Sequence, residues 1–304
     1  MVFEITTLGT GSAIPAYGRY LSGHLVNLQH RFFLIDCGEG TQFQLLKYKI
    51  NLQKIERVLI THLHGDHFYG LIGLVSSMGL LGRQYPLHIH GPRGLDEILT
   101  SHFRWGKAYP NFELCFHQNE GDDLHTVFED EQLAIDLFPL QHRVKCHGFL
   151  LREKFTNRKI VPEKLPPGLP HQLIRELVAG KDITFEGHVF ANQDLTLPPR
   201  KARSYAYCSD TAWVPRTADY VKKADLLYHE ATFIDEDQEQ AVAKAHSTAT
   251  EAAKVALKAG AGKLIIGHFS SRYRTTEQLL QEAQAVFPDT VLAKEGEIFG
   301  IPAG

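Results

Sequence analysis

The chain has 304 residues, a formal net charge of −3 and 43% hydrophobic residues, enough apolar material for one large core or two modest ones. It contains no run of about 18 apolar residues, which argues against a membrane partner. The opening residues, Met1–Gly9, carry no basic segment followed by a cleavage site, so they predict a first strand and not a signal peptide. Four cysteines lie far apart without CxxC spacing, which favours reduced thiols and a cytoplasmic protein.

Strand-like apolar runs recur along the chain, and each ends at a polar cluster. They are Phe3–Leu8, Phe32–Ile35, Arg57–Thr61, Leu133–Leu137, Ser204–Cys208, Ala224–Tyr228 and Lys263–Gly267. Helical patterns separate several of them: Gly40–Lys49, Tyr69–Leu81, Leu95–Phe103, Thr248–Ala259 and Thr276–Phe287. Thr248 and Glu251 form a predicted capping box, and Gly260 ends that helix. Strands alternating with helices predict a layered α/β sandwich.

One proline-rich stretch, Lys154–Pro199, interrupts this alternation and contains one short helical pattern at about Pro170–Ala179. It predicts an arm or insertion outside the core. Residues Arg143–Arg203, which include it, carry twelve Lys and Arg against six Asp and Glu, a local charge of +6. This asymmetry favours a confined basic surface for a polyanion, and the alternative is a solvated basic arm without a partner.

The strongest motif is His62-Leu-His64-Gly-Asp66-His67, which follows a predicted strand and has the form HxHxDH. In an extended backbone, side chains two residues apart point to the same side, so His62 and His64 can reach one metal ion. Asp66 and His67 can reach a second position after the turn at Gly65. Imidazole and carboxylate ligands predict zinc, with manganese or iron next. The alternative is a histidine-rich surface loop.

Further ligands stand where later strands give way to loops. They are His142, Asp210 and His268. Functional groups of α/β proteins collect at such strand ends. Asp210 has two carboxylate oxygens and could bridge two ions. Cys208 lies two residues before Asp210, but a buried thiol that packs the strand is the simpler interpretation.

The order of these residues resembles the metallo-β-lactamase superfamily. That resemblance implies an αββα four-layer sandwich and two Zn²⁺ ions per chain, with Mn or Fe as alternatives. One ion would be held by His62, His64 and His142, the other by Asp66, His67 and His268, and Asp210 would lie between them.

Other segments narrow the resemblance to ribonuclease Z. His229-Glu230-Ala-Thr and His246-Ser-Thr resemble its paired HEAT and HST motifs, and the segments at Leu8–Pro15, Asp36–Gln42 and His268–Tyr273 resemble its other loops. The resemblance implies a zinc-dependent endoribonuclease that removes 3′ trailers from precursor tRNA, leaving a 3′-hydroxyl and a 5′-phosphorylated trailer. Asp66 would accept a proton from the attacking water, and His246, steadied by Glu230, would protonate the leaving oxygen.

The same family carries a tRNA-binding arm, the exosite, and Glu153–Leu197 occupies its place in a domain that spans 1–304. Ser270, Arg272, Arg200, Lys201 and Arg203 are the candidate phosphate contacts. Two departures from the family pattern are Leu169, which separates Gly168 from Pro170, and Ser204, which replaces an Asn. The resemblance also implies a homodimer in which the arm serves the partner's site.

Two other functions remain open. The chain could be another hydrolase of this fold that acts on a small phosphodiester or thioester, because the fold alone does not fix the reaction. It could also be a binding protein with closed, purely structural zinc sites.

Overall fold

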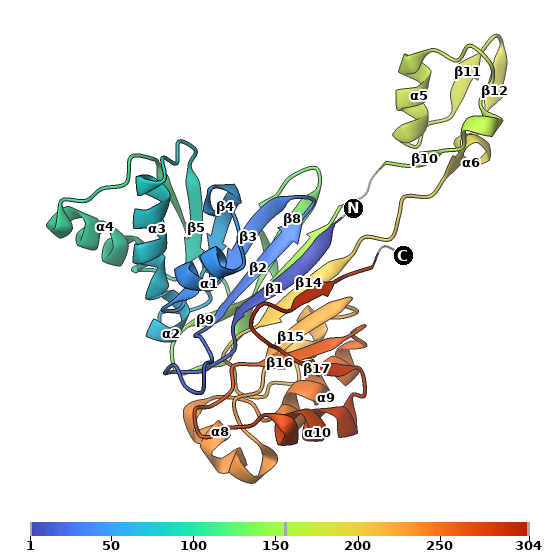
Figure 1. The fold of residues 1–304 in the computed structure, drawn as a ribbon. Helices are drawn as coiled ribbons and strands as arrows, with labels where there is room; N and C mark the ends of the chain where they lie inside the picture. Colours follow the sequence, from blue (N-terminus) through green and yellow to red (C-terminus); the bar gives the residue numbers. More distant parts are fainter. Residues whose placement is uncertain (1, 155–156, 303–304) are drawn as a thin grey trace.

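Two seven-stranded sheets dominate the computed structural model, which describes residues 2–154 and 157–302 (Figure 1). The first sheet has the order β18-β1-β2-β3-β4-β5-β6. Its strands are β1 Phe3–Gly9, β2 Gly23–Leu28, β3 Arg31–Ile35, β4 Ile55–Leu59, β5 Leu87–Gly91, β6 Leu114–Gln118 and β18 Ile298–Gly300. The strands from β3 to β6 run parallel, so the carboxyl ends of β4 and β5 lie at one edge of this sheet.

The second sheet has the order β17-β16-β15-β14-β9-β8-β7. Its strands are β7 His125–Glu129, β8 Leu133–Leu140, β9 Cys146–Glu153, β14 Ser204–Cys208, β15 Leu226–Glu230, β16 Leu264–Gly267 and β17 Thr290–Leu292. The strands β14 to β17 are parallel, and β14 pairs antiparallel with β9. The loops that follow β14, β15 and β16 therefore leave the sheet at the same end.

The two sheets pack face to face, and helices cover their outer faces, which gives four layers. A buried cluster that includes Ile5, Phe33 and Tyr205 fills the space between the sheets. The first sheet is covered by α1 Thr41–Lys47, α3 Gly70–Leu80 and α4 Leu95–Gly106, and the second by α7 Thr217–Tyr220, α9 Ala249–Ala259 and α10 Glu277–Val286. The predicted αββα sandwich is confirmed. None of the described helices is long and apolar enough to cross a bilayer.

Helix α9 begins as its sequence predicts. The Oγ1 of Thr248 accepts a hydrogen bond from the backbone N–H of Glu251, and the Glu251 carboxylate accepts one from the backbone N–H of Thr248. Gly260 ends the helix in the left-handed region, with φ 63°. This capping fixes the start of α9 and thereby the position of His246, two residues earlier.

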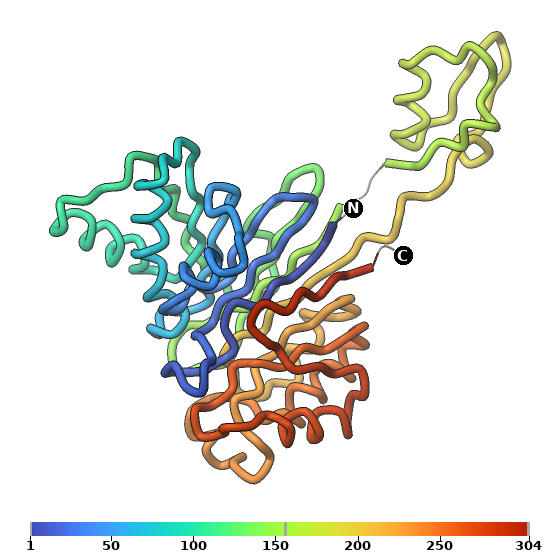
Figure 2. The backbone as a smooth tube through the Cα atoms, in the orientation of Figure 1, coloured from blue at the N-terminus to red at the C-terminus, as the bar shows by residue number. Residues whose placement is uncertain are grey.

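Residues 157–199 stand away from the sandwich, as Figures 1 and 2 show. Their elements are β10 Lys159–Ile160, η2 Pro162–Lys164, α5 His171–Val178, β11 Ile183–Phe185, β12 His188–Phe190, α6 Asn192–Leu195 and β13 Thr196–Leu197. Leu177, Ile183 and Leu195 form a small core of their own. Strands β10 and β13 pair at the base of this unit, so its two ends lie side by side.

The remaining short elements are α2 Gly65–Phe68, α8 Gln238–Lys244, η1 Leu52–Lys54 and η3 Asp235–Asp237. Two of the differences from the predicted strand boundaries concern the site. Strand β4 ends at Leu59, before Thr61. Strand β15 runs on to Glu230 because His229 pairs in register with Cys208 of β14, so His229 and Glu230 are buried strand residues.

Candidate metal centre

Four segments bring the predicted ligands together at one end of the sandwich. His62, His64, Asp66 and His67 follow β4, and His142 lies in the turn between β8 and β9. Asp210 follows β14, and His268 follows β16. All seven side chains fall into two neighbouring groups of potential metal ligands.

The first group consists of His62, His64, His142 and Asp210. The Nδ1 of His64 lies 3.0 Å from the Nε2 of His62 and 3.2 Å from the Nε2 of His142. The Asp210 Oδ2 lies 3.5 Å from the Nε2 of His62 and 3.8 Å from that of His142. A tetrahedral ion with bonds of about 2.0–2.1 Å places its ligand atoms roughly 3.3 Å apart. The group therefore fits one metal ion.

The second group consists of Asp66, His67 and His268. The Nε2 atoms of His67 and His268 lie 3.3 Å apart, and the Asp66 Oδ2 lies 3.6 Å and 3.4 Å from them, respectively. The Asp210 Oδ1 reaches this group as well, at 3.3 Å from His67 and 3.2 Å from His268. One Asp210 carboxylate thus faces both groups, one oxygen to each.

Asp210 supplies an independent indication of a cation. Its Oδ1 is buried and accepts no hydrogen bond from the described part of the chain. A buried carboxylate oxygen without a donor is costly unless a positive charge compensates it. The spacing and chemistry of the donors therefore fit a metal-binding centre.

The outward nitrogens of four of the five ligand histidines are also held. The Nδ1 of His67 donates to the Asp36 Oδ2 at 2.8 Å, and the Nδ1 of His142 donates to the backbone carbonyl of Ala245 at 2.8 Å. Hydroxyls serve the other two, because Thr61 lies 3.0 Å from the Nδ1 of His62 and Thr232 lies 2.9 Å from that of His268. A donating Nδ1–H leaves the Nε2 lone pair free for a metal ion.

Burial and charge set the protonation of these groups. Burial is the main cause that lowers the pKa of His62 and His142, and it lowers that of His64 to about 4. Burial also opposes the charge on His67, but the nearby carboxylates, Asp210 first, outweigh it and raise the His67 pKa well above its ordinary value. The three histidines of the first group are therefore neutral and ready to bind a cation, whereas a cation in the second group would displace a proton from His67.

Four residues at the centre have a strained backbone. Asp36 and His268 have φ values of 55° and 61°, and so do two neighbours of ligands, Ala13 at 60° and Ala245 at 55°. Such values are uncommon for residues other than glycine. The Ala13 N–H donates to the Asp66 Oδ2 at 2.7 Å, and the Ala245 carbonyl holds His142. The fold sustains this strain where it orients ligands.

His246 lies beside the centre, next to a fully buried glutamate. The His246 Nδ1 is 2.9 Å from the Glu230 Oε1, and its Nε2 is 4.0 Å from the Asp210 Oδ2. The Glu230 carboxylate also accepts the backbone N–H groups of Thr211, Thr232 and Ser247. Burial alone would lower the His246 pKa, but the Glu230 and Asp210 carboxylates raise it to about 9. His246 can therefore carry a proton at neutral pH.

A cavity of about 410 Å³ opens onto the centre. Its lining includes His64, Asp66, Asp210, His246 and His268. It also includes residues that the sequence did not single out for a role, among them Ala13, Ile14, Glu39, Tyr69 and Arg143. The only sign in the sequence that these residues belong to the site is that each lies in or within a few residues of a recognised motif.

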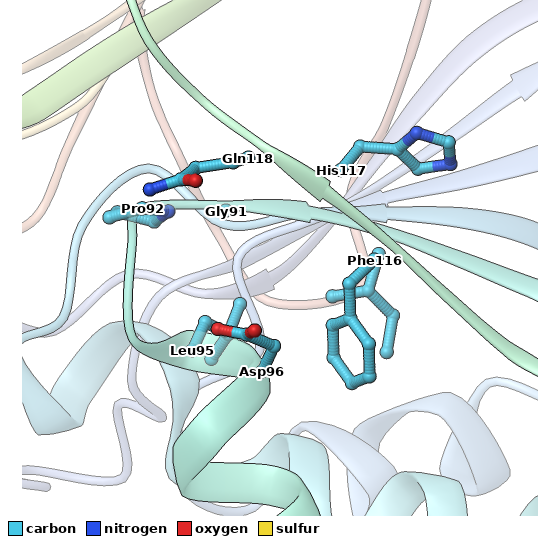
Figure 3. A pocket seen from close by; sticks show the side chains of 8 residues that line it. Gly91, Pro92, Leu95, Asp96, Phe116, His117 and Gln118 are labelled. Atoms are coloured by element: carbon cyan, nitrogen blue, oxygen red, sulfur yellow. The ribbon is translucent and has the colours of Figure 1, made fainter.

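A smaller cavity of about 180 Å³ lies elsewhere, between the start of α4 and the ends of β5 and β6 (Figure 3). Its polar lining residues are Asp96, His117 and Gln118. They form no group of metal ligands among the described residues.

The structure contradicts the prediction that Arg203 contacts a phosphate. Arg203 is 4% exposed, and its guanidinium binds the Glu153 carboxylate at 2.6 Å and the Ile301 carbonyl at 2.6 Å. Arg203 is thus a buried structural ion pair and not a contact for a polyanion. Lys201 is exposed and pairs with Asp225 at 2.6 Å, and Arg200 is exposed beside it.

The other two predicted contacts, Ser270 and Arg272, follow the ligand His268. Ser270 is buried and its Oγ accepts the backbone N–H of Arg272 at 3.3 Å, while the Arg272 side chain is exposed. Neither residue is part of the cavity lining. Ser270 and Arg272 therefore follow the ligand His268 in sequence but do not line the cavity, and their role as phosphate contacts stays a prediction.

Comparisons with known proteins identify the family. The chain is 43% identical to ribonuclease Z of Bacteroides fragilis (strain YCH46) over 295 residues, which cover 96% of this chain and 97% of that protein. It superposes on the human tRNase Z, short form, with a TM-score of 0.73 and 26% identity, covering 98% and 99% of the two chains.

Two further matches concern the fold and the amino-terminal half. The metallo-β-lactamase fold protein YhfI from Bacillus subtilis matches with a TM-score of 0.70 and 19% identity, covering 98% of each chain. A family model described as Anti-Pycsar protein Apyc1 matches residues 3–159. From the relatives that match nearly its whole length, the chain belongs to the ribonuclease Z family, and its fold is that of the metallo-β-lactamases.

Proposed function

We propose that this chain is a two-zinc endoribonuclease that removes the 3′ trailer from precursor tRNA. The observation that carries the proposal is the Asp210 carboxylate, which reaches His62 of one ligand group at 3.5 Å and His67 of the other at 3.3 Å. Pairs of metal ions about 3.5–4 Å apart serve phosphoryl-transfer enzymes in this way. Membership of the ribonuclease Z family supplies the substrate.

The donor set favours zinc. His62, His64 and His142 would hold one ion, Asp66, His67 and His268 the other, and Asp210 would bridge them. Imidazole nitrogens with a few carboxylate oxygens suit zinc, and manganese or iron would suit the same set less well. Several of these ligands line an open cavity, which supports a catalytic centre over a closed structural one.

When bound, such a metal pair activates a water molecule and screens the negative charge of the phosphate. The chain's own residues do the rest. The Asp66 carboxylate lies in the cavity and is positioned to accept a proton from that water. Its Oδ2 is held by the Ala13 N–H at 2.7 Å, which fixes the direction of the carboxylate.

His246 is the proposed general acid. Glu230 occupies its Nδ1, so the Nε2 is the nitrogen available on the cavity side for proton donation. Products with a 3′-hydroxyl and a 5′-phosphate require that the bond between phosphorus and O3′ breaks. The atom that receives the His246 proton is therefore the O3′ of the last tRNA nucleotide.

The arm is the proposed tRNA-binding exosite. Residues 157–199 stand apart from the metal centre and include an exposed basic side chain, Arg175, on α5. Arg200 and Lys201 lie exposed at the base of the arm. Such contacts orient a folded RNA through its backbone without reading its sequence. Ser270 and Arg272 remain weaker candidates, since they lie outside the cavity lining.

We also infer a homodimer. Support comes from exposed apolar side chains on two packed helices, with Phe43 66% and Leu46 52% exposed on α1, and Leu80 89% exposed at the end of α3. Phe43 and Leu46 lie three residues apart on α1 and so share one face, and an exposed apolar face of this kind marks an interaction site. Sedimentation of the wild type and of Phe43→Glu tests the homodimer, and a monomeric wild type would contradict it.

The four unpaired cysteines support a cytoplasmic location.

The test is incubation of zinc-loaded protein with a precursor tRNA that carries a 3′ trailer. We expect one cut next to the discriminator nucleotide, abolished by a chelator and by Asp66→Ala, while the variant still binds tRNA. Asp219→Ala, which removes an exposed carboxylate on α7, is the matched control. Zinc-dependent hydrolysis of a small phosphodiester or thioester without tRNA cleavage would instead support the other hydrolase function.

A second experiment separates the arm from the centre. Replacing residues 157–197 by a short Gly/Ser linker is feasible because β10 and β13 bring the two ends together. We expect loss of precursor tRNA cleavage and retained hydrolysis of a small phosphodiester. Equal loss of both activities would contradict the exosite role.

A further inference from the structure

The ring of Tyr69 is an exposed aromatic surface inside the cavity that holds the metal ligands. The side chain is 64% exposed and lines the cavity together with His64 and Asp66. Tyr69 is the residue that joins α2 to α3, so its backbone is fixed by a helix on each side. A large aromatic side chain that stays exposed next to a reaction centre offers apolar surface that a bound ligand can bury favourably.

Gly65, in the middle of the HxHxDH motif, leaves the space in which this ring lies. A Cβ atom at Gly65 would lie 2.2 Å from the Cε2 of Tyr69 and 2.6 Å from its Cδ2. Gly65 does not have a positive φ, so its backbone does not demand glycine. The ring therefore rests against the ligand-bearing turn itself, and its position relative to the metal ligands is fixed before any substrate binds.

The loop that follows β1 adds apolar surface to the same cavity. Ile14 is 59% exposed and lines the cavity with Pro15. The loop is tied to the centre because the Ala13 N–H donates to the Asp66 Oδ2 at 2.7 Å. The cavity thus combines a phosphodiester-binding centre with an aromatic ring and an aliphatic side chain, both held in place by contacts to the ligand segments.

We infer that Tyr69 stacks on the base of a nucleotide next to the scissile phosphate, with Ile14 and Pro15 completing the apolar contact. The inference rests on the proposed function and adds to it a positioning residue for the RNA chain. Every base has a π face, so stacking holds any base without reading its identity. This suits an enzyme that must process many tRNAs with different trailers.

Stacking also explains why the exposed tyrosine belongs at this position. The bases on either side of a phosphate lie within one nucleotide of it, and Tyr69 lies in the same cavity as Asp66 and His64. A base fixed on the ring would restrict the phosphate to one position over the ligands. Such restriction converts binding energy into correct alignment of the reacting atoms.

The test uses single-turnover cleavage of a precursor tRNA by zinc-loaded wild type, Tyr69→Ala and Tyr69→Phe. Each protein is assayed on a normal substrate, on one with an abasic nucleotide 5′ to the cut and on one with an abasic nucleotide 3′ to it. Tyr109→Ala is the matched control, because Tyr109 is 59% exposed but does not line the cavity. Zinc content and thermal unfolding establish that each variant is intact.

We expect Tyr69→Ala to lose about 5- to 100-fold in the cleavage rate or apparent affinity on the normal substrate, the range of one lost base–aromatic stack. Tyr69→Phe and Tyr109→Ala should stay within about twofold, since each keeps a stacking ring at position 69. On one of the two abasic substrates the difference between wild type and Tyr69→Ala should vanish. The substrate on which it vanishes identifies the side of the cut from which the base comes.

A loss in Tyr69→Ala that persists unchanged on both abasic substrates would overturn the inference, and so would no loss at all. Either result leaves the proposed function standing, because the wild type still cuts at the discriminator. Failure of the wild type to cut there would overturn the proposed function instead. The two failures are therefore distinguishable within one experiment.

Discussion

The Nδ1 of His246 lies 2.9 Å from the Oε1 of Glu230, and that carboxylate is fixed in turn by three backbone N–H groups. Burial raises the pKa of Glu230, but the interaction with His246 is strong enough to lower it below its ordinary value. A buried carboxylate held in this way orients the imidazole and stabilises its protonated form. The relationship joins β15 to the loop before α9, which are brought together only by the fold.

Glu230→Gln should weaken this pair. We expect kcat to fall by about 10- to 100-fold, less than the roughly 10²- to 10⁴-fold that a positioned general acid contributes in full, because His246 itself is still present. The His246 pKa of about 9 is raised by Glu230, so the acid stays protonated as the pH rises toward that value. Without the carboxylate, activity should decline at a lower pH on the alkaline side of the kcat profile. Glu97→Gln, which changes an exposed carboxylate on α4, is the control. An alkaline limb that does not move in Glu230→Gln would contradict the role.

His246→Ala tests the same pair from the other side. Cleavage should slow by about 10²- to 10⁴-fold while both metal ions stay bound. Metal analysis of the purified variant decides this, because His246 also lies within ligand distance of Asp210 and His268. Loss of one ion would make His246 a metal ligand and not the general acid.

Asp36 should set the metal affinity of the second ligand group. Its Oδ2 accepts the His67 Nδ1–H at 2.8 Å, and Thr61 and the Tyr207 hydroxyl also donate to the carboxylate. Asp36→Asn should weaken binding of the second ion by about 10- to 100-fold, the usual effect of removing such a partner. Competition with a chromophoric chelator measures this affinity. Asp225→Asn should leave it unchanged, and an equal loss in both variants would refute the specific role of Asp36.

Arg203 should matter for stability and not for tRNA binding. Removing it in Arg203→Met leaves the buried Glu153 carboxylate without its partner, at a cost of about 3–5 kcal/mol in the free energy of unfolding. Lys201→Met, at a site 70% exposed, should change stability by less than about 0.5 kcal/mol but reduce tRNA affinity and its salt dependence. Denaturant unfolding measures the effect of each substitution on stability, and tRNA titrations at two salt concentrations measure its effect on binding. Weaker tRNA binding by a fully folded Arg203→Met would restore the original assignment.

The contrast between Arg203 and the metal ligands shows which features a sequence reveals. His62, His64, Asp66 and His67 lie within six residues after a strand, so their chemistry is visible locally. The ion pair of Arg203 with Glu153 joins residues 50 positions apart. The sequence around Arg203 is basic, and from it alone Arg203 was predicted to lie on an exposed surface. Burial depends on what the rest of the chain places over a residue, and local composition carries little of that information.

The residues that hold the metal ligands in place could not be predicted from the sequence either. Ala245 holds His142 through its backbone carbonyl and Ala13 holds Asp66 through its N–H, so neither side chain gives a signal. The left-handed φ values of these two alanines are also invisible, because alanine does not favour that conformation. The layers of the fold were predictable because alternating strands and helices follow from hydrophobic periodicity, whereas the strand that carries Glu230 was cut short at Tyr228.

The last prediction concerns His24 of β2, which lies between the sheets against the rings of Tyr205, Tyr207 and Tyr228. Its ring is fully buried, the Nδ1 is hydrogen-bonded to the Tyr205 hydroxyl at 2.8 Å, and burial lowers its pKa to about 3. Well above pH 6.5, His24 is neutral in both the folded and the unfolded chain and adds no pH dependence to stability. The unfolded chain takes up a proton near pH 6.5 and the folded chain only near pH 3, so His24 disfavours the folded state progressively as the pH falls from 6.5 toward 3. Between pH 6.5 and pH 5 the loss should be about 1.6 kcal/mol. His24→Leu should remove this part of the acid sensitivity, as measured by denaturant unfolding at several pH values in matched zinc. An unchanged pH dependence in the variant would show that His24 is protonated in the folded protein.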